Sequence, residues 1–130
     1  MRPNKRIAKE GFEMPKMTPE LYTLRRVVID EIYRIKNTYT KLPRIDVRIV
    51  NPVGGTHCGY AWLSSNIIHI NSKWVGSKQI PEIVAHEIVH AVTGFRHDDK
   101  CPLMSPCCNS NALSHTKVDE CLEKYLAEYK

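Results

Sequence analysis

The sequence of 130 residues contains no apolar stretch long enough to cross a bilayer, which takes about 20 residues. Its first residues, MRPNKRIAKEGFEMPKM, are basic but have no apolar region of the kind found in a secretory signal peptide. Cysteines are few, and their count of five is odd. An odd count fits reduced thiols better than a complete disulfide framework. We therefore expect a cytoplasmic protein that does not enter a membrane.

Long basic runs and internal repeats are also missing. The 19 Lys and Arg exceed the 14 Asp and Glu, which gives a net charge of +5. Without aromatic residues interleaved among the cations, this charge permits nucleic-acid proximity but does not indicate it. Arg25, Arg26, Arg34 and Lys36 are expected on the solvated face of a helix. The length predicts one domain over 18–130, preceded by a flexible arm over 1–17.

Apolar periodicity and turn residues predict an α+β fold. Thr18 is the expected cap of the first helix, and Ser114 or Thr116 that of the last. The second and third strands are expected to form a hairpin, joined at Ser64-Ser65, beside the first strand. In order, the expected elements are a helix from Pro19 to about Asn37, strands over 45–50, 59–63 and 66–71, a helix over about 79–94, a loop over 105–112 and a final helix.

The stretch His86-Glu87-Ile88-Val89-His90 carries the strongest chemical signal. On a helix, residues four apart project from one face, so His86 and His90 can bind the same metal ion. Glu87 then lies beside that metal. Zinc held by three protein ligands keeps an open position for water, and a neighbouring carboxylate can take a proton from that water.

The surroundings of this stretch predict a buried helix. Ser77 is a candidate N-cap, Pro81 falls in the first turn and Gly94 can end the helix. Because most other positions are apolar, the two histidines and the glutamate need buried polar partners. One metal ion would satisfy all three, and the alternative is an ordinary polar network.

Residues 59–129, roughly half of the chain, resemble the metzincin clan of zinc peptidases, whose pattern is HExxHxxGxxH followed by a Met-turn and a C-terminal helix. His86, Glu87, His90, Gly94, His97 and Met104 match that pattern in order. The segment ALSHTKVDECLEKYL is similar to the segment that follows the Met-turn in matrixin-like members, and the cysteines near His97 resemble those of archaemetzincins. The resemblance implies a small zincin-like domain, with Met104 as an apolar floor beneath the metal.

The chain departs from the family in two ways. The archaemetzincin cysteine spacing is not reproduced, because no Cys follows His97 directly and no later CxxC exists. The second departure is in the metal-binding pattern. Ala91-Val92-Thr93 separate His90 from Gly94, so Gly94 and His97 each fall one residue late. One extra residue turns an ideal helix by about 100°, so the helix must end in a π-bulge or a looser turn for His97 to reach the metal. Asp98 or Asp99 could serve as the third ligand instead.

SprT-like proteases are the second family that the chain resembles. Some of them also have three residues between the second histidine and the glycine, and they are basic and intracellular. The resemblance to this second family implies a DNA-associated protease. The order of Met104 and the capped last helix favours the metzincin pattern, and the zinc ribbon of many SprT-like proteins is missing from this sequence.

The sequence therefore predicts a monomeric zinc metalloendopeptidase acting on a peptide or protein. Zinc is expected on His86, His90 and His97, with Glu87 as general base and then proton donor to the leaving amine. The alternatives from other classes are the DNA-associated protease and a non-catalytic domain that zinc stabilises.

Two weaker signals remain. Cys101, Cys107, Cys108 and Cys121 could hold a second, structural zinc, although adjacent Cys107 and Cys108 are an awkward pair for one metal; the alternative is buried or free thiols. In zincins the strand before the active-site helix is the sheet edge that pairs with substrate, and NIIHIN, with His69, occupies that place. A plain half-buried strand is the other interpretation. His57 and His115 have no partner at ligand spacing.

Overall fold

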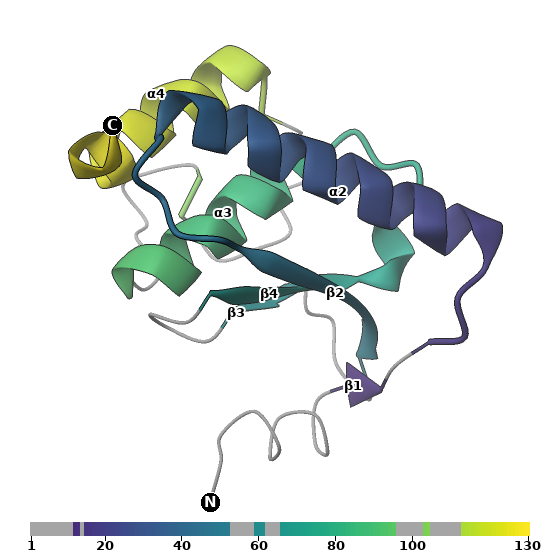
Figure 1. Cartoon of the computed structure of the whole chain (residues 1–130). Coiled ribbons are helices and arrows are strands. Elements are labelled where there is room, and N and C mark those ends of the chain that lie inside the picture. Colours follow the sequence, from purple (N-terminus) through teal and green to yellow (C-terminus); the bar gives the residue numbers. More distant parts are fainter. Residues whose placement is uncertain (1–11, 14, 53–58, 62–65, 96–102, 105–112) are drawn as a thin grey trace, which may run out of the picture.

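A computed structural model of the chain describes residues 12–13, 15–52, 59–61, 66–95, 103–104 and 113–130 (Figure 1). It confirms a mixed α+β domain. In order, the elements are strand β1 (Phe12–Glu13), helix α2 (Pro19–Thr38), strands β2 (Asp46–Pro52), β3 (Gly59–Ala61) and β4 (Ile67–Asn71), a 3₁₀ turn (Ser72–Trp74), helices α3 (Ile80–Thr93) and α4 (His115–Leu126), and a 3₁₀ turn (Ala127–Tyr129). No helix in the described ranges is both long and apolar enough to span a membrane.

The four described strands form a mixed sheet in the order β1-β2-β4-β3. β2 and β4 run parallel, with Val47 beside Ile68 and Ile49 beside Ile70. β3 runs antiparallel to β4, which confirms the expected hairpin pairing. Ile68 and Ile70 are fully buried with Val47 and Ile49, so one face of the β2–β4 pair forms the floor of the core.

The sheet corrects the expectation that NIIHIN is an edge strand. β4 lies between β2 and β3, because each of those strands pairs with one of its two sides. His69 is therefore an interior strand residue and is 7 % exposed. On that side of the sheet the outermost described strand is β3.

The N-terminal arm contains a strand that the sequence did not predict. Phe12 pairs with Pro52 and Glu13 with Asn51, in antiparallel register with the end of β2. The rest of the arm before Pro15 lies outside the described residues, and Met17 packs against the core. The arm is therefore attached to the sheet at this short strand.

Helix α2 forms as its periodicity predicts. The Thr18 hydroxyl accepts a hydrogen bond from the Leu21 N–H at 3.3 Å and so caps the first turn, which Pro19 also favours. Apolar residues at three- and four-residue spacing, which is the period of a helix, form its buried face: Leu21, Leu24, Val28, Ile32 and Ile35. This face covers the sheet and also contacts α3.

Two of the four α2 cations, Arg34 and Lys36, are less exposed than predicted. Arg34 is 36 % exposed and donates to Glu31 on its own helix at 2.7 Å and to Asp119 of α4 at 3.1 Å. Both carboxylates raise the pKa of the Arg34 guanidinium. This charged cluster joins the two outer helices, while Arg25 and Arg26 are exposed as predicted.

Helix α3 occupies the centre of the domain. It contacts α2, α4, β3 and β4, which explains why it is buried from Ile80 to Ala91 apart from Pro81 (Figure 1). Ser77 does not cap it: the cap residue is Gln79, whose N–H donates to the Ser77 hydroxyl at 3.0 Å. Pro81 in the first turn and Gly94 at the end are confirmed.

Helix α4 closes the fold against α3. Of its two candidate caps, Ser114 is the one used, and its hydroxyl accepts from the Lys117 N–H at 3.2 Å. Val118, Cys121, Leu122, Tyr125 and Leu126 form the buried face. The predicted loop over 105–112 lies outside the described residues.

Candidate metal centre

His86 and His90 meet on one face of α3, as their spacing predicts. Their ring centroids lie 4.6 Å apart with the planes at 80°, and the two Nε2 atoms are 3.0 Å apart. The residues are 6 % and 9 % exposed. Two Nε2 atoms of buried imidazoles thus face each other.

Main-chain carbonyls orient both rings. The Nδ1 atom of His86 lies 2.6 Å from the Leu103 carbonyl oxygen, and Nδ1 of His90 lies 2.6 Å from the Phe95 carbonyl oxygen. A carbonyl oxygen only accepts, so each Nδ1 is the atom that carries a proton. In a neutral ring Nε2 is then the nitrogen that bears the lone pair, and it is the atom that can bind a metal.

The end of α3 delivers the carbonyl that orients His90. Gly94 adopts a left-handed conformation with φ 77°, and its N–H donates to the His90 carbonyl at 3.1 Å. The Phe95 N–H then donates to the Thr93 hydroxyl at 3.1 Å. Glycine ends the helix here because it has no Cβ to strain this backbone conformation. The helix is regular up to Thr93 and ends in an ordinary left-handed glycine cap, and the segment with His97 that the expected π-bulge or looser turn would serve lies outside the described residues.

The distance between the two rings tests whether zinc fits. Two neutral imidazoles with facing Nε2 lone pairs repel each other unless a cation or a shared proton lies between them. Nitrogens bound to one tetrahedral zinc at about 2.0–2.1 Å lie about 3.3 Å apart. The observed 3.0 Å is close to this separation. The two histidines fit zinc without a change of tautomer or a large movement.

Glu87 and Met104 are both buried. Glu87 is 3 % exposed, and this burial raises the pKa of its carboxyl from 4.5 to about 8. Met104 is fully buried and follows Leu103, whose carbonyl contacts His86. A bound cation near Glu87 would favour the ionised carboxylate and oppose the effect of burial.

The candidates for a third ligand lie outside the described residues. His97, Asp98 and Asp99 all fall there, as do Cys101, Cys107 and Cys108. Within the described residues no group of three His, Cys, Asp or Glu is placed to hold a metal. Cys121 is buried in α4. The histidine pair is thus the part of the predicted zinc site that the structure describes.

Sequence reasoning missed one buried carboxylate on α3. Glu82 is 8 % exposed and accepts a hydrogen bond from the Leu113 N–H at 3.0 Å, and burial raises its pKa. The position of Glu82 among apolar residues of the helix could have indicated that it is buried. The Glu82–Leu113 hydrogen bond and the His86–Leu103 contact therefore attach the chain to α3 before and after residues 105–112. His57 lies outside the described residues, and His115 is exposed.

Comparison with known proteins adds no relative. No protein-family model matches the chain, and neither does any curated protein.

The buried carboxyl of Glu87 gives the metal-free protein a pH-dependent stability. Because its folded pKa lies near 8 and its unfolded pKa near 4.5, the native state binds more protons between these values. Stability should therefore fall as pH rises through this window, by up to about 1.4 kcal/mol per pH unit. Urea unfolding of the zinc-free chain between these pH values measures the slope.

Glu87→Gln is the control for this slope, because glutamine stays neutral. The pH slope of the variant's stability should lack the contribution of Glu87 and keep the contribution of Glu82. Added zinc should flatten the wild-type slope. Equal slopes for the two metal-free chains would show that Glu87 is not a buried neutral acid.

Proposed function

We propose that this protein is a zinc-dependent metalloendopeptidase in which His86 and His90 hold the metal. The observation that carries the proposal is the pair of Nε2 atoms 3.0 Å apart, with each Nδ1 fixed on a main-chain carbonyl. Catalytic zinc sites in proteins commonly use histidines that are oriented in this way. His97 is the proposed third ligand, and Asp98 and Asp99 are the alternatives.

Zinc in such a site lowers the pKa of water in its open position and polarises the substrate carbonyl. Glu87 follows His86 in the chain, and we assign it the proton transfers. Its carboxylate accepts a proton from the attacking water and then donates it to the leaving amine. Burial alone raises the pKa of this carboxyl to about 8, and the positive charge of a bound zinc would lower it again, which favours the carboxylate that the first transfer needs. Met104 would supply the apolar floor.

The wider assignment follows from the same residues. We propose a zincin-like catalytic domain over 18–130, with the metzincin pattern ranked above the SprT-like one. A peptide or protein is the proposed substrate, and the domain is proposed to act as a monomer. The odd cysteine count supports a cytoplasmic setting.

Zinc analysis combined with a peptidase assay tests this proposal. The purified chain should contain about one zinc, because one site with three ligands is proposed. A chelator should abolish hydrolysis of a quenched-fluorescent peptide library, and added zinc should restore it.

Each other outcome has a distinct meaning. Zinc with no hydrolysis of any library would favour a zinc-stabilised binding domain. A stoichiometry near two that falls to one in Cys121→Ser would support the second, structural zinc. A chain with no zinc after zinc loading would overturn the proposal and leave a proton shared between the two rings.

A further inference from the structure

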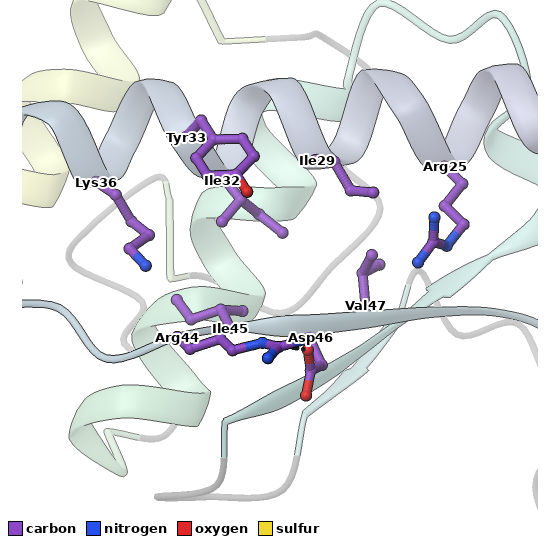
Figure 2. Close-up of a pocket in the computed structure, with 9 residues that line it drawn as sticks. All are labelled: Arg25, Ile29, Ile32, Tyr33, Lys36, Arg44, Ile45, Asp46 and Val47. Carbon is purple, nitrogen blue, oxygen red and sulfur yellow. Dashed lines mark hydrogen bonds and ion pairs between the residues drawn. The ribbon is translucent and has the colours of Figure 1, made fainter.

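A pocket lies between α2 and β2, away from the histidine pair. Its volume is about 160 Å³, and Figure 2 shows it between the helix and the start of the strand. Four aliphatic side chains line it: Ile29 and Ile32 from α2, Ile45 from the residue before β2, and Val47 from β2. Ile29 is half-buried and the other three are buried. The pocket can hold one apolar side chain of moderate size.

Cations dominate the rim of this pocket. Arg25, Lys36 and Arg44 line it together with one carboxylate, Asp46. Arg44 donates to Asp46 at 3.2 Å, so these two charges offset each other. Arg25 and Lys36 remain, and Figure 2 shows both extending from α2 towards β2. They are eleven residues apart on the helix, which places them about 16 Å apart.

Among the described residues, part of one edge of the strand beside the pocket has no strand partner. The Asp46 N–H donates to the Asn66 carbonyl on the β4 side at 2.8 Å. Peptide groups alternate along a strand, so those of Val47 and Ile49 point to the opposite edge. β1 covers that edge only at Asn51 and Pro52. In the described part of the chain, no strand pairs with Val47 or Ile49 on this side.

We propose that this pocket and the adjoining edge of β2 bind an extended acidic peptide segment. The segment adds a strand to β2, and its main chain bonds to the peptide groups of Val47 and Ile49. Alternate residues of the added strand face the pocket. Residues i and i+4 are then about 14 Å apart, which matches the spacing of Arg25 and Lys36 within the reach of these long side chains.

The preferred segment therefore has the form acid-x-apolar-x-acid. The two carboxylates meet Arg25 and Lys36, and the central apolar side chain enters the pocket between them. Binding here needs neither zinc nor Glu87, because none of the residues around the pocket belongs to α3. The inference therefore stands apart from the proposed catalytic function.

Two other occupants fit less well. A second copy of the chain pairing through the same edge would bring the basic rims of two pockets together, and like charges repel. A single-stranded nucleic acid would match the cations. A nucleic acid would not fill the aliphatic pocket, and its backbone would not match the N–H and C=O groups along the edge of β2.

Fluorescence anisotropy with a labelled peptide, Ser-Glu-Thr-Leu-Thr-Glu-Ser, tests the proposal. The full chain is used as wild type and as Glu87→Gln, in which peptide hydrolysis cannot compete with binding. Arg25→Glu combined with Lys36→Glu should weaken binding at least about tenfold. The matched control is Arg26→Glu combined with Lys78→Glu, which makes the same change in net charge at exposed residues that do not line the pocket. It should change affinity less than about twofold.

Peptide variants test the other two contacts without altering the protein. Serine in place of the central leucine should weaken binding about tenfold, since an apolar side chain no longer fills the pocket. N-methylation of one alternate set of backbone nitrogens should abolish binding, while methylation of the other set should preserve it.

The proposal is wrong if the peptide does not bind, or if both pairs of charge reversals weaken it equally. If the two N-methylated sets had equal effects, the peptide would not bind as an added strand, and that part of the proposal would be wrong. Tighter binding of a single-stranded oligothymidine than of the peptide, lost in the Arg25 and Lys36 variant, would assign the pocket to nucleic acid instead.

Discussion

Replacing Glu87 with glutamine should leave zinc bound and reduce peptide hydrolysis by about 100- to 10,000-fold. The reason is that glutamine matches glutamate in size but cannot accept the proton of the attacking water. The metal ligands are unchanged, so zinc content should stay near that of the wild type. Measuring kcat/KM on the best library peptide, with zinc content on the same samples, separates the two effects.

The matched control is Glu82→Gln. Glu82 is also buried on α3, one turn before the histidine pair begins, and an amide oxygen can still accept the hydrogen bond from the Leu113 N–H. This variant should keep most of the activity. Undiminished hydrolysis by Glu87→Gln would exclude Glu87 from the mechanism, whatever happens at Glu82.

Removing either histidine of the pair should abolish tight zinc binding. In His86→Ala or His90→Ala only two of three protein ligands remain, and the two facing Nε2 atoms that define the site are reduced to one. Dialysis against a weak chelator, followed by metal analysis, should find zinc in the wild type and almost none in either variant. His115→Ala, which alters an exposed histidine at the start of α4, should retain it.

The same assay ranks the candidates for the third ligand. His97→Ala should weaken zinc binding strongly, while Asp98→Ala and Asp99→Ala should cause smaller losses, because a carboxylate can orient a ligand without touching the metal. Full zinc retention in His86→Ala or His90→Ala would end the proposal for this site. Retention in His97→Ala alone would move the third ligand to an aspartate.

The helices were predictable because their signals are local. The Thr18 and Ser114 caps, the apolar period of α2 and Gly94 after α3 each act within one or two turns. The facing of His86 and His90 follows from helical geometry alone. Their placement side by side could therefore be predicted before any tertiary contact was known.

What the sequence could not predict depends on contacts between distant segments. A strand's neighbours are not encoded in its own alternation, so the interior position of β4 and the pairing of β1 with the end of β2 were missed. Arg34 was assigned to solvent because Asp119, its partner on α4, is 85 residues away. The carbonyl partners of the two histidines leave no mark in the sequence, because every residue has a carbonyl.

Those carbonyl partners make the orientation of the histidines resistant to point mutation. A side-chain acceptor can be lost in a single substitution, whereas the oxygens of Leu103 and Phe95 persist whatever side chains these positions carry. Only a shift of the backbone can move them, and Leu103 is held by the burial of its side chain. Natural variants of this protein should therefore tolerate many residues at position 95, which is exposed. At position 103 they should accept only those that fill the core.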